Sequence, residues 1–290
     1  MNAILRHRGV TSSSEGFVGL SPQLHALSDS IDRHFLQLAS RFGAAQQTFS
    51  PLLPVDELRR LDYFSAFPHL VFFPASAARD QGTLEQFAAA NAAGTTGALA
   101  IGKIAPVQWV LAPAACYAVY IDLQDQVLPA PAHRLTVRGT CFRAETSFAP
   151  LVRQPSFSMR EIVHIGTAAS VREFLREARD AACALAASWG LSPAIEPASD
   201  PFFDPARSPR YLHARLFPSK HEFVVDGIAL GSLNDHRNFF GEAFAIEVEG
   251  QAAHTACLAF GIERWLHALL QRYGSAEAAQ RAMSSEGIRT

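Results

Sequence analysis

Two long strand-like runs separated by a short loop constrain the fold of this chain more than any other feature. The runs are RLTVRGTCFRAET (134–146) and PSFSMREIVHIG (155–166), joined by a loop around residues 148–154. Such a loop can connect only antiparallel neighbours, because a parallel pair needs a crossover of a dozen or more residues. The sequence therefore predicts an antiparallel strand pair.

Helices are predicted on both sides of this pair. Directly after it, Ser170 and Glu173 form a capping box, and Gly190 ends the helix that follows. An earlier helix begins at Ser21 and Pro22 and keeps helical apolar spacing as far as Gly43. Shorter helices are expected after the prolines of FSPLLPVDELRRL (49–61) and near residue 115, and a last one in IERWLHALLQRYG (262–274).

Further strands are expected elsewhere in the chain. They are a strand that begins near Pro68, and the runs 223–233, 244–250 and 255–261. Residues 196–220 are rich in Pro, Asp and Arg and are expected to be irregular, whereas the Ala/Gly-rich stretch 76–102 has no assignment. Strands that return by hairpins and are interrupted by long helices predict an α+β fold: a mostly antiparallel sheet flanked by helices.

Composition narrows the function classes. The chain has 290 residues, 49% of them hydrophobic, and a formal net charge of −2. A chain with this many apolar residues can bury a large core. Its slightly negative net charge does not favour general binding to nucleic acid. The four cysteines are far apart, which argues against a disulfide framework and for a reducing, cytoplasmic setting. No apolar run approaches the roughly 18 residues of a membrane span.

The strand pair carries an unusual set of side chains. Arg143 and Glu145 share one face of the first run, and Phe157 and Glu161 share one face of the second. An aromatic ring suits a base, an arginine suits phosphate and a carboxylate suits an ammonium group. The set fits a nucleotide and an amine, although a solvated face with surface ion pairs explains it about equally well.

A second stretch favours the nucleotide. In CLAFGIERW, Gly261 and Arg264 lie where a strand becomes a helix, so a ligand can approach the backbone beside a guanidinium group. FRAE (142–145), RQPSFSMRE (153–161) and GIER (261–264) together resemble the second and third signature motifs of class II aminoacyl-tRNA synthetases. The first helix and the segment after SAFPHL are a weaker match to the first, dimer-forming motif.

The resemblance becomes narrower with PAACY (113–117), RGTCFRAETS (138–147), ALGSLNDHRNFFGEAF (229–244) and CLAFGIERW (257–265). These stretches resemble the amino acid:carrier-protein ligases, which are relatives of the catalytic domain of atypical seryl-tRNA synthetases. The resemblance implies a class II-like catalytic domain over 21–275, with a loose arm (1–20) before it and a flexible tail (276–290) after it. It also implies a cytoplasmic homodimer.

The same resemblance implies a metal site and two reaction steps. In that family a zinc ion is bound by Cys, Glu and Cys, which correspond here to Cys116, Glu161 and Cys257. The spacing alone does not indicate zinc, since isolated cysteines are usually small core hydrophobes; Cys141 and Cys183 are expected to be such core residues. ATP, with Mg²⁺, and a small amino acid such as glycine or alanine would give an aminoacyl-adenylate. The aminoacyl group would then pass to the phosphopantetheine thiol of a carrier protein.

The resemblance assigns roles to individual residues. Arg143 would contact the α-phosphate, Phe157 would stack on adenine with Arg264 on its opposite face, and Glu145 would lie near the adenine amino group. The expected catalytic residues are Arg143 and Arg264. The expected ATP-binding residues are Arg143, Glu145, Arg153, Gln154, Phe157, Lys220, Ala229, Leu230, Gly231, Ser232 and Arg264. Glu161, Ser232 and Asn234 are expected to bind the amino acid, and Glu247 or Glu249 could help to hold Mg²⁺. The histidines near the motifs are expected to be packing or hydrogen-bonding residues; they are His164, His213, His221, His236 and His254.

The last expectation concerns the carrier protein that accepts the aminoacyl group. Residues 196–226 are expected to form a carrier-docking insertion, because Arg207, Arg210, Arg215 and Lys220 could attract an acidic carrier protein. An ordinary surface loop is the alternative. No tRNA is expected as a partner, since only about twenty residues precede the first helix and no basic patch stands out. Two alternatives remain: a seryl-tRNA synthetase that lacks its tRNA-binding domain, and a regulatory paralogue.

Overall fold

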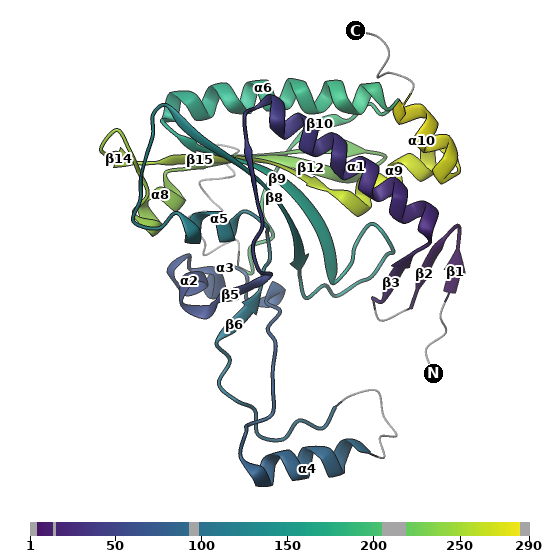
Figure 1. The fold of residues 1–290 in the computed structure, drawn as a ribbon, viewed down its shortest axis with the longest axis vertical. Helices are drawn as coiled ribbons and strands as arrows, with labels where there is room; N and C mark the ends of the chain where they lie inside the picture. The colour runs from purple at the N-terminus through teal and green to yellow at the C-terminus, as the bar shows by residue number, and fades with distance from the viewer. Residues whose placement is uncertain (1–4, 14–15, 93–98, 205–218, 285–290) are drawn as a thin grey trace.

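A seven-stranded sheet forms the centre of the molecule (Figure 1). The structure is a computed structural model and describes residues 5–13, 16–92, 99–204 and 219–284. The strand order is β10 (Ala194–Ala198), β11 (Lys220–Val225), β12 (Ile228–Arg237), β15 (His254–Gly261), β9 (Ser156–Gly166), β8 (Ala132–Phe142) and β4 (Ala45–Gln47). Every neighbouring pair is antiparallel except β4 and β8. The predicted α+β fold and the predicted strand pair are confirmed.

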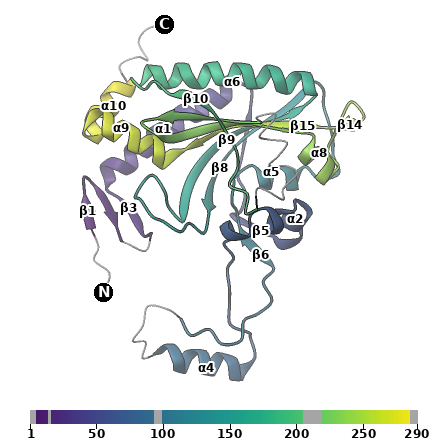
Figure 2. The ribbon, with the colours of Figure 1, turned by 180° about the vertical axis from the view of Figure 1, so that it is seen from behind.

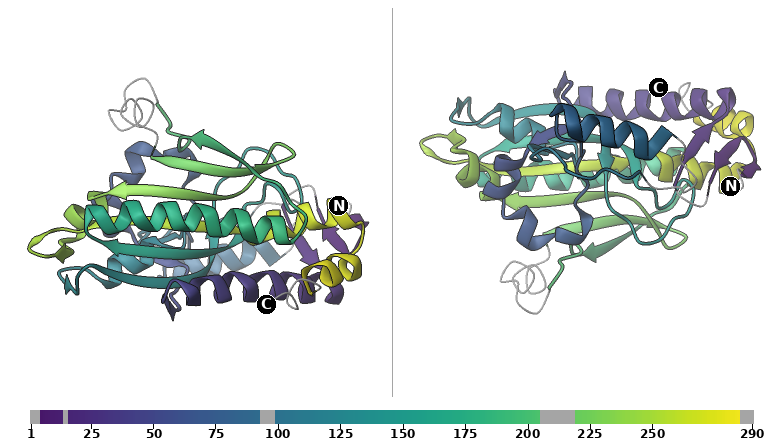
Figure 3. Two further views of the ribbon diagram at one scale, coloured as in Figure 1. Left: turned by 90° about the horizontal axis from the view of Figure 1, so that it is seen from above. Right: turned by 90° about the horizontal axis from the view of Figure 1, so that it is seen from below.

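Long helices cover one face of this sheet (Figures 1 and 3). They are α1 (Pro22–Arg41), α6 (Ala168–Ser188) and α9 (Ile262–Tyr273), with α10 (Ala276–Ser284) at the end of the chain. Their apolar sides meet in one cluster with Ile162, Leu258 and Phe260 of the sheet. Burial of these apolar sides stabilises such helices more than helix propensity does.

The other face of the sheet is covered by short elements. They are α2 (Val55–Arg60), α3 (Tyr63–Ala66), α5 (Tyr117–Asp122) and α8 (Phe239–Phe244), and they form a second cluster with Val163 and Ile165. Side chains of β9 therefore alternate between two cores. Arg160 points to the α1 side, where it binds Asp32, and Glu161 points to the side of α5.

The two long predicted helices form for the reasons expected, with one correction. The Ser21 hydroxyl accepts a hydrogen bond from the Leu24 amide at the start of α1. The start of α6 was predicted wrongly, because its cap is Thr167, whose hydroxyl accepts from the Ser170 amide. Ser170 lies inside the helix, and Glu173 is exposed on its surface.

Three predicted strands also differ from the structure. The segment after Pro68 forms a 3₁₀ turn, η1 (Pro68–Leu70), followed by an irregular stretch. The run 223–233 is a hairpin, because Asp226 and Gly227 both have positive φ and turn the chain between β11 and β12. The run 244–250 contains only the two-residue strand β13 (Glu247–Val248), which pairs with β14 (Gln251–Ala252) and β7 (Val127–Leu128).

The stretch without a sequence assignment forms an arm that extends away from the body (Figures 1 and 2). The arm extends from beside the antiparallel pair of β5 (Leu52–Pro54) and β6 (Trp109–Leu111) and carries α4 (Gln81–Ala92) at its far end. Its two sides are joined by hydrogen bonds from Ala78 to Lys103 and from Ala105 to Ser76. No residue of α4 is buried, so the arm adds nothing to either core.

Secondary structure is present within both of the terminal segments that were expected to be loose or flexible. The N-terminal segment 1–20 contains a small antiparallel sheet of β1 (Leu5–His7), β2 (Val10–Ser12) and β3 (Val18–Leu20). The predicted flexible tail contains α10, because Ala279 and Met283 are buried against α1 and α9. Residues 285–290 lie outside the described residues. Within the described ranges, no helix has the length and apolar character needed to cross a bilayer.

Candidate active site

A pocket lies where the loop after β8 returns to β9 and where β11 and β12 pass the start of α9. All eleven residues that the sequence assigned to ATP line it. They are Arg143, Glu145, Arg153, Gln154, Phe157, Lys220, Ala229, Leu230, Gly231, Ser232 and Arg264. Four of them are cationic, so the pocket suits an anionic ligand.

The arginines of the pocket are held by specific contacts. The Arg143 guanidinium lies over the Phe157 ring, 5.0 Å from its centroid, and donates to the Pro113 carbonyl at 3.3 Å. Arg264 donates to the carbonyls of Val152 (2.9 Å) and Ala229 (2.8 Å). Arg264 therefore ties the loop to β12 and shapes the pocket from within.

Acidic partners surround the remaining cations. Arg153 donates to Glu145 at 2.9 Å, and the Lys220 ammonium lies 3.0 Å from Asp200 and 3.3 Å from Glu222. Burial disfavours the charge on Lys220, but the carboxylates Asp200 and Glu222 outweigh it and raise the pKa of that amine. Lys220 is thus kept charged beside the pocket.

Gly261, where the sequence predicted close approach of a ligand, also lines the pocket. Five lining residues were not anticipated, namely Leu151, Val152, Met159, Glu222 and Glu263. Glu222 lies two residues after Lys220 on the same strand, so period-two alternation could have predicted it. Both carboxylate oxygens of Glu263 accept from the Ser158 amide at 2.9 Å. This contact ties the first turn of α9 to β9.

A buried cluster lies beside the pocket. One ligand atom from each of Cys116, Glu161 and Cys257 lies within 4.8 Å of the others. Cys116 caps α5, Glu161 lies on β9 and Cys257 on β15, and none of the three is more than 3% exposed. Three elements that are distant in sequence thus bring two sulfurs and a carboxylate to one point.

The carboxylate of this cluster could hold a cation. One Glu161 oxygen accepts from the Ala115 amide at 3.0 Å, and the other has no hydrogen-bond partner in the described part of the chain. Burial, together with the nearby Cys257 charge, raises the pKa of Glu161 to about 7. A buried carboxylate oxygen without a donor is unfavourable unless a cation satisfies it. Two thiolates and a carboxylate are donors that suit zinc.

A chain of contacts links the cluster to the pocket. The Asn234 amide nitrogen donates to the Cys257 sulfur at 3.2 Å and to the Ser232 hydroxyl at 3.0 Å. Ser232 lines the pocket, whereas Asn234 lies opposite Cys257 on the neighbouring strand. Both were expected to bind the amino acid, and they lie between the two parts of the site.

Several other expectations can be compared with the structure. Glu247 and Glu249 lie at β13 and just after it, and neither lines the pocket, so they were wrong candidates for Mg²⁺. Cys141 is fully buried in the second cluster and Cys183 packs on the first. Arg207, Arg210, Arg215 and His213 lie outside the described residues, as does the whole of 205–218 within the expected docking insertion (196–226).

The histidines divide into two kinds. His164 accepts from Arg134 at 3.1 Å, lies 3.0 Å from the Ser170 hydroxyl and is fully buried, as expected of a packing residue. His221 and His254 do not line the pocket. His236 differs, since its Nε2 lies 3.9 Å from the Cys257 sulfur. Nothing in the sequence separates it from the others.

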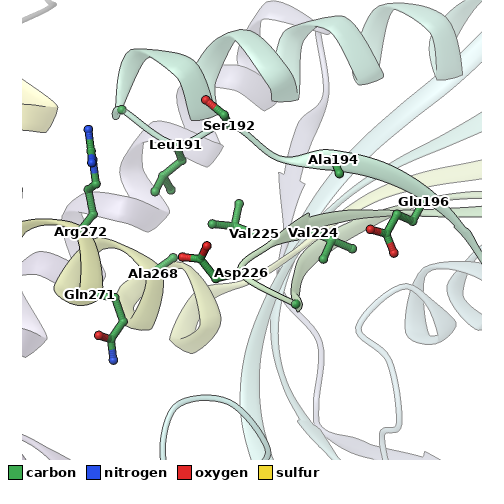
Figure 4. A pocket seen from close by; sticks show the side chains of 12 residues that line it. Leu191, Ser192, Ala194, Glu196, Val224, Val225, Asp226, Ala268, Gln271 and Arg272 are labelled. Carbon is green, nitrogen blue, oxygen red and sulfur yellow. The ribbon is translucent and has the colours of Figure 1, made fainter.

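A larger hollow of about 790 Å³ lies elsewhere, between the end of α6, the outer strands of the sheet and α9 (Figure 4). Most of its lining is small or apolar. Its charged side chains, Glu196, Asp226 and Arg272, are spread around it and do not converge on one point (Figure 4). None of the residues that the sequence assigned to the site lines this hollow.

Known proteins place these observations in context. No family model matches the chain. The amino acid–(acyl-carrier-protein) ligase 1 of Bradyrhizobium diazoefficiens is 32% identical over 241 residues, which cover 80% of this chain and 73% of that protein. The type-2 serine–tRNA ligase of Methanothermobacter thermautotrophicus is 25% identical over 280 residues, 87% of this chain. The chain spans only 52% of that ligase.

A solved structure supports the fold. The M. kandleri SerRS, in complex with A. aeolicus tRNASec, superposes with a TM-score of 0.75 at 22% identity. The superposition covers 94% of this chain and 57% of that one. The expected class II synthetase-like fold is confirmed.

Proposed function

The chain belongs to the amino acid–(acyl-carrier-protein) ligases, and from this membership we propose that it activates a small amino acid with ATP and passes it to a carrier protein. One observation carries the details. The cationic pocket and the buried Cys116–Glu161–Cys257 cluster are joined through Ser232 and Asn234. The site therefore has one place for a nucleotide and an adjoining place for an amino acid.

In the first step, a carboxylate oxygen of the amino acid forms a bond to the α-phosphorus of ATP. The bond from that phosphorus to the bridging oxygen breaks, and pyrophosphate leaves. Arg143 stabilises the negative charge that develops at the α-phosphate. Its guanidinium covers one face of Phe157, so adenine would stack on that face only after the guanidinium moves to the phosphate. Arg153, Lys220 and Arg264 neutralise the outer phosphates and shape the pocket.

Cys116, Glu161 and Cys257 would hold a zinc ion. When bound, zinc supplies a Lewis-acid position for the substrate amino group. Hydrogen bonds within the chain orient two of the proposed ligands. The Ala115 amide orients Glu161, and Asn234 orients Cys257. Mg²⁺ would accompany ATP, and Glu222 is the carboxylate of the pocket best placed to meet it, because it lines the cavity beside Lys220.

In the second step, the thiol sulfur of the carrier's phosphopantetheine forms a bond to the carbonyl carbon of the adenylate. The bond from that carbon to the phosphate oxygen breaks, AMP leaves, and the thiol proton passes to solvent. The product is a thioester. Glycine and alanine are the proposed substrates, the enzyme is proposed to be a homodimer, and no tRNA is proposed to take part. The prediction that the insertion at 196–226 docks the carrier stays a prediction, since its central residues, 205–218, lie outside the described residues.

Amino-acid-dependent pyrophosphate exchange tests this function. With ATP and labelled pyrophosphate but no tRNA, glycine or alanine should support exchange, and a phosphopantetheinylated carrier should then become aminoacylated. The matched control is the same carrier without its phosphopantetheine. Exchange with serine together with charging of tRNA would show a seryl-tRNA synthetase, and absence of exchange with all three amino acids would show a non-catalytic relative.

A further inference from the structure

Cys257 has a second neighbour that the proposed reaction does not use. His236 lies on β12, two residues after Asn234, so both side chains share a face of the sheet. The pairing with β15 shifts between Asp235, opposite Ala256, and Arg237, opposite Thr255, so His236 lies in an irregularity of the strand. From there its ring reaches the side chains of Thr255 and Cys257. Its Nε2 lies 3.9 Å from the Cys257 sulfur, at the long end for an N–H···S contact.

The other ring nitrogen has hydroxyl neighbours on two elements. Nδ1 lies 3.3 Å from the Tyr120 hydroxyl and 3.3 Å from the Thr255 hydroxyl. A hydroxyl can donate to an unprotonated Nδ1, and the ring then carries its proton on Nε2. In that tautomer Nε2 carries a hydrogen that can be donated to the Cys257 sulfur. A thiolate is stabilised by such a donor.

The ring is also held in place by packing. His236 makes an edge contact with Phe240, with ring centroids 5.0 Å apart, and Phe240 is stacked on Tyr120 at 3.9 Å. Tyr120 belongs to α5, the helix that Cys116 caps. The contacts of His236 therefore run from the strand that carries Cys257 to the helix that begins at Cys116.

We propose that His236 is a positioning residue for Cys257: its Nε2–H donates to the sulfur, while Tyr120 and Thr255 fix the tautomer. The inference rests on the proposed zinc site. His236 is not itself one of the ligands, because the group of mutually close ligand atoms in the described chain comprises Cys116, Glu161 and Cys257 alone. Partners behind a metal ligand typically contribute about 10–100-fold to metal affinity.

Metal affinity, measured on the full chain without any substrate, tests this proposal. Metal-free protein is titrated with zinc against a chromogenic chelator, and with Co²⁺ to record the visible spectrum. His236→Leu should bind zinc about 10–100-fold more weakly than wild type. His236→Gln, which keeps an N–H near the sulfur, should stay within a few-fold. Tyr120→Phe combined with Thr255→Val should fall between the two. His254→Leu, on the same strand as Cys257, is the matched control and should bind as wild type does.

Each result decides a separate point. Unchanged zinc affinity in a folded His236→Leu protein would overturn the positioning role alone. If that variant does not fold, equal affinities for wild type and the Tyr120/Thr255 double variant would overturn it instead. A Co²⁺ spectrum that changes between wild type and His236→Gln would make His236 a direct ligand and contradict the proposal. Wild type that binds no zinc would refute the proposed metal site itself.

Discussion

Glu161 is the residue from which the proposed metal site can be tested most directly. One of its buried oxygens has a donor and the other has none among the described residues. The residues proposed to contact the nucleotide, Phe157 and the arginines, line the neighbouring pocket instead. We therefore expect substitutions to separate metal binding from nucleotide binding.

We expect Cys116→Ala, Glu161→Ala and Cys257→Ala each to lose zinc and amino acid activation, while ATP binding largely survives. Removal of one of three ligands should release the metal. Elemental analysis, pyrophosphate exchange and a calorimetric ATP titration measure the three properties. Cys183→Ala, a substitution outside the cluster, is the control. Active wild-type protein without zinc would contradict this prediction.

For Arg143 the expected effect is on turnover. Arg143→Ala should lower kcat by about 10²–10³-fold and change the KM for ATP far less, because the charge that it neutralises is largest in the transition state. Arg153→Ala, which removes an exposed cation paired with Glu145, should affect turnover much less. If Arg143→Ala weakened ATP binding and left kcat unchanged, Arg143 would be a ground-state contact.

His164 gives the fold a pH dependence. Burial, with a smaller contribution from the Arg134 charge, lowers the pKa of His164 from 6.5 to about 4. The unfolded chain therefore binds this proton first as the pH falls. The contribution of His164 to stability is complete above pH 6.5 and is lost as the pH falls towards 4, by about 1–3 kcal/mol. Urea unfolding at several pH values should show this slope in wild type and a flatter one in His164→Gln; parallel slopes would contradict the assignment.

At the scale of the elements, the sequence predicted what depends on local periodicity. The spacing of apolar residues was sufficient to predict α1 and α9, and the alternation of side chains was sufficient to predict β8 and β9. Each of these elements buries one face. The prediction was wrong where a local pattern had two readings: the apolar run after Pro68 is irregular, and Ser170 only resembled a cap. The arm could not be assigned, since α4 buries no side chain and so has no stripe to detect.

An ion pair ties α1 to the strand that carries Glu161. Arg160 is 1% exposed and donates through two nitrogens to the two oxygens of Asp32, each at 2.8 Å. Asp32→Ala would leave this guanidinium buried without its carboxylate, which should destabilise the protein by about 3–5 kcal/mol. Asp29→Ala, one turn earlier and facing Arg138, should cost below about 1 kcal/mol. Urea denaturation compares the two, and equal losses would refute the distinction.

At the scale of the whole molecule, the site depends on contacts that only the fold creates. All eleven expected ATP residues line one pocket, because the motifs that suggested them mark the ends of neighbouring strands. Their chemical roles stay predictions. His236 could not be singled out, since Tyr120 is 116 positions away in the chain and the two meet only when α5 packs beneath β12.

The arm formed by residues 76–102 divides the chain into two parts that both contribute to the two cores. Residues before it supply α1 and Phe42 to one core and Leu53, Leu58, Leu61 and Tyr63 to the other. Residues after it supply the remaining buried residues of both cores. We therefore expect two separately translated polypeptides, 1–79 and 104–290, to find each other and assemble without the segment between them. Co-purification of the two halves and amino-acid-dependent pyrophosphate exchange measure this, with the intact chain as reference. If the two halves assemble and catalyse pyrophosphate exchange, the catalytic body can be divided into two chains. Halves that stay apart would show that the arm is needed to join them.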